Sequence, residues 1–150
     1  MGSTLTNILL HIIFSTKDRD PLITQKYKAR LYAYIGGIII REKAVPIDIG
    51  GVEDHIHIAV RIKPNDSVSD LVRSIKANSS KWINDSHLSK TYFAWQGGYA
   101  AFSVSESQIY KVKDYINNQE EHHRQLTFKD ELLKMLEKHN IDFDEKYLWN

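Results

Sequence analysis

The chain has 150 residues, of which 42% are hydrophobic and 26% charged, and its formal net charge is +1. That length and balance fit a globular chain with its own core, so we expect residues 1–150 to form one domain. The sequence has no cysteines, which excludes disulfides, zinc–thiolate sites and thiol nucleophiles. The near-neutral charge also differs from that of proteins that coat long duplex DNA.

The apolar runs of the chain are short. The longest, within residues 8–14 and 38–40, are far from the roughly 20 residues that a bilayer-spanning helix needs. The first residues also lack a basic segment followed by an apolar stretch and a small-residue cleavage site. We therefore expect a soluble, unexported, cytoplasmic protein.

The first half of the chain predicts a strand, a helix and a second strand. Residues 7–15 are rich in Ile and Leu and are typical of a buried strand. Thr24 can cap a helix that runs to about residue 42, with apolar side chains at helical spacing. Residues 46–50 predict the second strand, and Gly50-Gly51 a turn after it.

The clearest pattern in the sequence lies in residues 52–63. Ile56, Ile58 and Val60 alternate there with His55 and His57. Because side chains alternate between the two faces of a strand, this period of two predicts a third strand with one buried face. It should pair with the second strand as a hairpin.

The second half predicts helices around a short strand. Asp66 or Ser67 can cap a helix that continues to about Trp82. Residues 91–95 and 99–104 predict short strand pieces, and helices follow over residues 105–123 and 127–139.

This order of elements predicts an α+β fold. Its first six elements match a ferredoxin-like βαββαβ sandwich, an antiparallel sheet with both helices on one face, followed by C-terminal helices. The opposite face of the sheet would then be bare, and a bare face invites a partner or a ligand.

The histidines of the third strand form a candidate metal site. His55 and His57 point the same way, with Cα atoms about 7 Å apart, so both imidazoles can bind one divalent ion. The alternation places them away from the core, on the face without helices. A polar strand face without metal fits the same pattern, and a third ligand is needed to decide. Ala59 stands where a His-x-His-x-His nucleotide hydrolase has its third histidine, which weakens that alternative.

A tyrosine and a glutamine on the predicted helix 105–123 are candidates for chemistry. Tyr115 and Gln119 are four residues apart and therefore share a helix face. A phenol can attack a phosphodiester, and a carboxamide oxygen can complete a metal site. Packing of Tyr115 in the core is the alternative. On chemistry alone, Tyr99 and Tyr110 are equally possible nucleophiles.

Together these residues resemble a known family. His55-Ile56-His57 is similar to the histidine–hydrophobe–histidine (HUH) motif of single-strand DNA nicking enzymes. The segment from Tyr115 to Gln119 resembles the Tyr-Ile-x-x-Gln signature of single-tyrosine transposases of the insertion sequence 200/605 family. Residues 11–17, 95–105 and 119–123 also look like family segments. The resemblance covers residues 5–140.

The resemblance implies an enzyme that cuts and rejoins single-stranded DNA through a 5′-phosphotyrosine. It makes His55, His57 and Gln119 the ligands of Mg²⁺ or Mn²⁺, and Tyr115 the nucleophile. It implies DNA with hairpin ends as the partner, no nucleotide cofactor, action at the nucleoid and a homodimer. In the family's active form, the tyrosine helix of one subunit reaches the histidines of the other. The sequence leaves open whether the helix docks in cis or in trans.

Contacts to DNA can be suggested from charge and aromatic side chains. Basic side chains that could meet phosphates are Lys17, Arg19, Arg73 and Lys76. Solvent exposure without function is equally compatible with them. Trp95, Tyr99 and Phe102 could stack on bases, but we expect at least two of them to pack in the core. We assign no chemistry to His122, His123 and Arg124.

Three alternatives remain beside the transposase. A nicking enzyme of replication or plasmid transfer would use the same chemistry but usually carries further domains. A domesticated relative would bind hairpin DNA without cutting it. A plain ferredoxin-like module would need His55, His57, Tyr115 and Gln119 to coincide by chance.

Overall fold

The computed structural model describes residues 2–123 and 126–150. Its centre is a four-stranded antiparallel sheet with the strand order β2-β3-β1-β4, as a ferredoxin-like sandwich requires. The strands are β1 (Ile8–Ser15), β2 (Val45–Val52), β3 (His55–Ile62) and β4 (Ala100–Val104). The prediction of an α+β fold of this type is confirmed.

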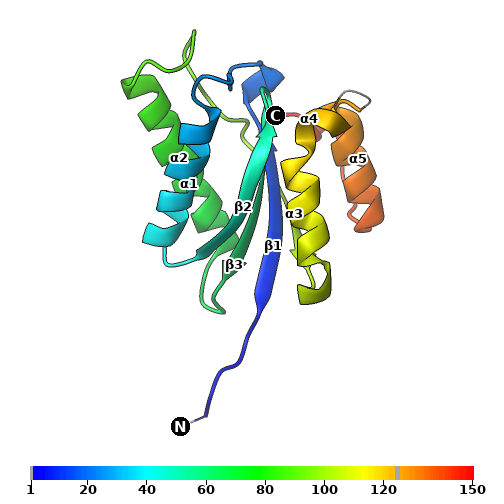
Figure 1. Ribbon diagram of the computed structural model, residues 1–150. Coiled ribbons are helices and arrows are strands. Elements are labelled where there is room, and N and C mark those ends of the chain that lie inside the picture. The colour runs from blue at the N-terminus through cyan, green and yellow to red at the C-terminus, as the bar shows by residue number, and fades with distance from the viewer. Residues whose placement is uncertain (1, 124–125) are drawn as a thin grey trace.

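Helices cover both faces of this sheet (Figure 1). α1 (Lys28–Arg41) and α2 (Val68–Asp85) lie on one face, and α3 (Ile109–Asn117), α4 (Gln119–His122) and α5 (Phe128–Lys138) on the other. Short helical segments complete the chain: η1 (Lys17–Arg19), η2 (Glu106–Gln108) and α6 (Glu145–Leu148). None of the helices in the described part of the chain has both the length and the hydropathy needed to span a bilayer.

The larger core lies between the sheet and the helices α1 and α2. Ile56, Ile58 and Val60 of β3 are fully buried there, together with Ile35 of α1 and Ile75 of α2. The period-two pattern of β3 therefore identified its core face correctly. Each of these side chains leaves water completely, and each contributes roughly 1.5–3 kcal/mol by the usual transfer free energy.

The opposite face is not bare, so that prediction is wrong. A second apolar cluster joins it to α5 and contains Ile13, Phe102, Phe128, Leu132 and Leu136. Because the apolar stripe of α5 needs a partner surface, it packs on the face that β1 and β4 present. β1 is consequently buried on both faces, which explains its nearly unbroken apolar sequence.

Gly50 and Gly51 belong to β2 and do not form the predicted turn. They pair with His57 and Ile56 of β3, and the tight connection falls at Glu53 and Asp54 instead. A Cβ atom on Gly50 would lie 2.6 Å from the carbonyl oxygen of Ile116. The missing side chain therefore serves packing, because it lets α3 lie directly on β2.

Side-chain caps fix the starts of two helices, and Ser67 is one of the two residues predicted to cap α2. The hydroxyls of Ser67 and Thr127 accept hydrogen bonds from the backbone N–H of Asp70 and Asp130, which fixes the starts of α2 and α5. Thr24 does not cap α1 through its side chain. Its carbonyl closes a turn with the N–H of Tyr27, so α1 begins later than predicted.

Candidate metal and nucleophile site

The two histidines of β3 lie on the face that α3, α4 and α5 cover. His55 and His57 have no exposed surface, and their ring centroids are 5.2 Å apart. They share a face opposite Ile56 and Ile58, as the alternation predicted. The expectation that this face is open to a ligand is wrong, because the C-terminal helices cover it.

Each of these imidazoles has an outer hydrogen-bond partner that orients it. His55 Nδ1 lies 2.7 Å from Asp54 Oδ1, and His57 Nδ1 lies 2.8 Å from His11 Nε2. Once a cation replaces the proton on Nε2, Nδ1–H can donate to such a partner and hold the ring in place. Both Nε2 atoms point at the same centre, where they meet side chains from the C-terminal helices.

Gln119 and Tyr115 reach this centre from the α3–α4 segment. Gln119 Oε1 lies 3.2 Å from His55 Nε2, and the Tyr115 ring centroid lies 5.5 Å from that of His57. The predicted continuous helix is interrupted at Asn118, but the spacing of four residues still brings Tyr115 and Gln119 to the same side. All four predicted residues are thus brought together within one chain.

Two further residues at the centre were not predicted. His123 Nε2 lies 3.1 Å from Gln119 Oε1. Glu131 of α5 is only 2% exposed, and its Oε1 contacts the imidazoles of His55, His57 and His123. Its other oxygen, Oε2, accepts a hydrogen bond from the Tyr115 hydroxyl. Arg124, named beside His123 in the sequence, lies outside the described residues.

A signal for Glu131 was present in the sequence. Phe128, Leu132 and Leu136 form the apolar stripe of α5, and Glu131 stands within that stripe at helical spacing. A carboxylate on the buried face of an amphipathic helix requires partners. For His123, no comparable local signal exists.

Burial and charge shift the protonation of these groups in opposite directions. Burial would lower the pKa of His55, but its hydrogen bonds to Asp54 and Glu131 and their negative charges raise that pKa to about 9. Burial lowers the pKa of His57 to about 4, although Glu131 partly offsets this effect. Burial and the neighbouring His57 lower the pKa of His11 to about 3.

The acidic and phenolic groups are coupled to each other. Hydrogen bonds from the three imidazoles outweigh burial and hold the pKa of Glu131 far below its usual range. Burial and the charge of Glu131 raise the pKa of the Tyr115 phenol well above its usual value. The centre therefore holds a carboxylate beside a neutral phenol.

The donor atoms of this centre fit a divalent cation. One ligand atom each from His55, His57, His123 and Glu131 lies within 4.8 Å of the others, a spacing that a single ion can bridge. Imidazole nitrogens and a carboxylate are ligands that first-row divalent ions accept. The described residues thus include a group that could hold a metal ion.

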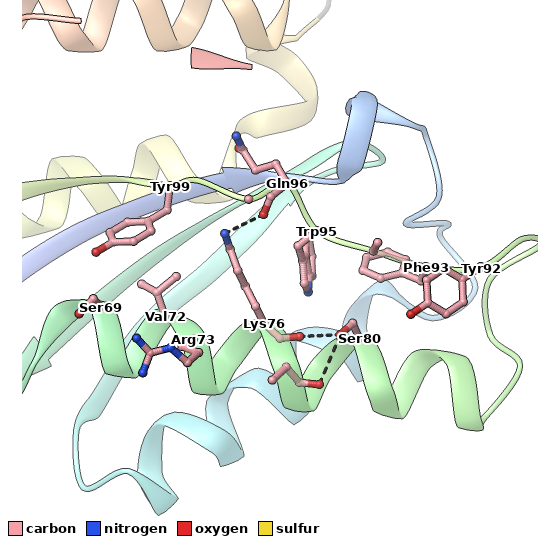
Figure 2. A pocket seen from close by; sticks show the side chains of 13 residues that line it. Ser69, Val72, Arg73, Lys76, Ser80, Tyr92, Phe93, Trp95, Gln96 and Tyr99 are labelled. Carbon is pink, nitrogen blue, oxygen red and sulfur yellow. Dashed lines mark hydrogen bonds between the residues drawn. The ribbon is translucent and has the colours of Figure 1, made fainter. Parts of the chain in front are cut away.

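The basic residues Arg73 and Lys76 line a cavity of about 510 Å³ on the other face of the sheet (Figure 2). Figure 2 shows Lys76 extending from α2 toward Gln96, with Tyr99, Trp95 and Tyr92 on the opposite wall, while the Arg73 side chain stays close to the helix. Arg73 is exposed and pairs with Asp70 at 2.9 Å. Lys76 is half-buried and donates hydrogen bonds to the carbonyls of Gln96 and Gly98, at 2.9 and 2.6 Å.

The other predicted DNA contacts lie elsewhere. Lys17 is exposed at the end of β1, and the Arg19 guanidinium lies 5.7 Å from the ring centroid of Trp149. Trp95 and Phe102 are buried at 8% and 2% exposure, which confirms the expectation that at least two of the three aromatic candidates pack in the core. Tyr99 remains 40% exposed.

Comparison with known proteins agrees with this architecture. Residues 4–119 match the model of the family described as "Transposase IS200 like". A solved putative transposase from Deinococcus radiodurans R1 is 19% identical, with a TM-score of 0.63 over 79% of this chain and 95% of that one. A REP-associated tyrosine transposase bound to a REP hairpin is 14% identical, with a TM-score of 0.61 over 82% and 72%. A search of curated proteins found no match.

Proposed function

Because the chain belongs to the IS200-like transposase family, we propose that it cuts and rejoins single-stranded DNA at insertion-sequence ends. Tyr115 is the nucleophile in this proposal, and His55, His57 and Gln119 hold a divalent metal, Mg²⁺ or Mn²⁺. The observation that carries the proposal is the meeting of these four side chains in one buried polar centre.

The metal would act as a Lewis acid on a nonbridging oxygen of the scissile phosphate. Tyr115 is held near that position by its hydrogen bond to Glu131 and by contact of its ring with the rings of His57 and His122. Such fixed placement replaces a search over orientations and lowers the barrier to in-line attack.

The covalent step exchanges one phosphate ester for another. The bond between Tyr115 Oη and phosphorus forms while the bond from phosphorus to the 3′ oxygen breaks, leaving a 5′-phosphotyrosine and a free 3′-hydroxyl. As the new bond forms, the phenol becomes strongly acidic, and its proton can pass to the Glu131 carboxylate. The leaving 3′ oxygen takes up a proton from solvent water. Because the ester keeps the bond energy, a second 3′-hydroxyl can rejoin DNA without a nucleotide cofactor.

A phosphate can reach this centre only if part of its cover moves. His55 and His57 have no exposed surface, and Glu131 of α5 stands between them and Tyr115. The cover that must shift is therefore α5 or the α3–α4 segment. This closure is also the observation that favours the second candidate, a relative that binds hairpin DNA without cutting it.

The proposed partner is single-stranded DNA with hairpin ends, by analogy with the relative solved with a REP hairpin. Lys17, Arg19 and Arg73 are proposed to contact phosphates, and Lys76 can add its third ammonium donor.

The homodimer remains a prediction. The Tyr115 ring centroid lies 5.5 Å from that of His57 of its own β3, and we propose on this basis that the centre forms in cis.

The proposal is tested by incubating the protein with single-stranded element ends and Mn²⁺ or Mg²⁺, then looking for a covalent protein–DNA band on a denaturing gel. Tyr115→Phe should abolish the band and keep hairpin binding. The matched control is Tyr110→Phe, because Tyr110 is on the same helix and 58% exposed. A band from Tyr115→Phe would overturn the nucleophile. No band from the wild type, with hairpin binding intact, would favour the binding-only relative.

A further inference from the structure

The Glu131 carboxylate occupies the point on which the donors of the metal centre converge. Its Oε1 lies 3.2 Å from His55 Nε2, 3.1 Å from His57 Nε2 and 3.3 Å from His123 Nε2. Its Oε2 accepts the hydrogen bond from Tyr115. One side chain therefore contacts both the candidate metal ligands and the candidate nucleophile.

Burying the Glu131 carboxylate at this position costs free energy unless its interactions there compensate for the loss of water. Glu131 stands between Phe128 and Leu132 on the apolar face of α5, and its side chain is 2% exposed. Removing a charge from water costs several kcal/mol, and an apolar side chain of similar volume would pack there without that cost. The interactions that compensate for this cost are the contacts of the Glu131 carboxylate with three imidazoles and one phenol.

We propose that Glu131 and His123 are further ligands of the cation, and that Glu131 also positions the Tyr115 hydroxyl beside it. This inference rests on the proposed function, and it extends the ligand set beyond the two histidines of the strand and Gln119. Glu131 supplies a ligand from α5, and His123 follows the last residue of α4. The ion would therefore tie the C-terminal segments to β3 until a phosphate takes the place of one of these ligands.

The enlarged ligand set also bears on which ion binds. Three imidazoles, a carboxylate and a carboxamide supply more nitrogen than Mg²⁺ accepts, because Mg²⁺ prefers oxygen ligands and retains several waters. Imidazole suits the first-row divalent ions much better. Of the two ions considered, the centre should therefore favour Mn²⁺ over Mg²⁺.

The opposite role for Glu131 makes the opposite prediction. If the carboxylate only filled an apo site, it would compete with the cation for the imidazoles, and its removal would tighten binding. A ligand, in contrast, adds negative charge and an oxygen donor to the site. The sign of the change in Mn²⁺ affinity therefore separates the two roles.

The test is Mn²⁺ titration of the full chain by calorimetry, without DNA. Glu131→Gln and His123→Ala should each weaken Mn²⁺ binding by at least about tenfold, the lower end of the range for altered metal sites. The matched control is Glu137→Gln, an exposed acid on the same helix, which should bind like the wild type. An unchanged or tighter affinity for Glu131→Gln would overturn the proposal.

Two further measurements keep the test decisive. Mn²⁺ should slow amide hydrogen exchange in α5 of the wild type, because the ion would fasten that helix to the sheet; faster exchange would overturn the proposal without any variant. His57→Ala should lose Mn²⁺ binding. If His57→Ala binds as tightly as the wild type, the ion is not at this centre and the proposed function itself fails.

Discussion

The two faces of the sheet are covered by helices but are held by different interactions. The face toward α1 and α2 is closed by a large apolar cluster, including Ile35, Ile58 and Ile75. The face toward α3–α5 has a small apolar cluster beside a buried group of histidines, a glutamine and a carboxylate. We expect the first arrangement to contribute more to global stability than the second, whose apolar cluster is smaller.

The largest effect should come from a cavity in the apolar face. Ile58→Ala should lower the free energy of unfolding by about 2–5 kcal/mol, because Ile58 is fully buried among side chains that cannot refill the space. Denaturant titration measures this loss. Leu132→Ala, on the other face, should cost less in the same titration but speed amide hydrogen exchange in α5. Equal losses from both variants would contradict the difference between the faces.

A medium effect is expected where α3 meets β2. Gly50→Ala places a Cβ atom against the carbonyl of Ile116, so α3 must shift, at a cost of about 1–3 kcal/mol. Tyr115 moves with that helix. The rate of DNA cleavage should therefore fall by more than the loss of folded protein alone would explain. The control is Gly37→Ala, where a new Cβ atom has nothing within 4 Å. Because alanine favours helix more than glycine does, this variant should gain about 0.5–1 kcal/mol in free energy of unfolding.

The helix caps allow a finer comparison. Ser67→Ala and Thr127→Ala each remove one hydrogen bond to the first turn of α2 or α5, worth about 1 kcal/mol. Loss of the α2 cap should lower global stability in thermal unfolding. Loss of the α5 cap should speed amide hydrogen exchange in α5 and leave the midpoint of thermal unfolding nearly unchanged. A lower midpoint from Thr127→Ala would show that α5 unfolds together with the sheet.

The last effect is a pH dependence on the α2 side. Burial lowers the pKa of Lys76 to about 8 from 10.5. Between these pH values the unfolded chain keeps a proton that folded Lys76 has lost, so the contribution of Lys76 to stability rises with pH across this window. Urea titrations at several pH values should show a flatter profile for Lys76→Met. Lys134→Met, at an exposed position, is the control and should keep the wild-type profile. If Lys76→Met also keeps that profile, the pH dependence of stability does not come from Lys76.

The sequence allowed the sheet and four of the six residues at the centre to be predicted, because those residues follow local patterns in the chain. The alternation along β3 fixes which face His55 and His57 occupy, and helical spacing brings Gln119 near Tyr115. Glu131 and His123 reach the centre only because α5 docks on the sheet. That docking depends on apolar contacts between residues far apart in the chain, which no short pattern records.

The cis placement of Tyr115 over its own strand bears on kinetics. When a single polypeptide carries every group needed to open a phosphodiester, the rate of the first incision per molecule should not change with protein concentration. Under the proposed function, rejoining two DNA ends would engage two such centres and should accelerate as molecules are brought together. Dilution would then separate the two halves of the reaction, with incision persisting after strand exchange has stopped.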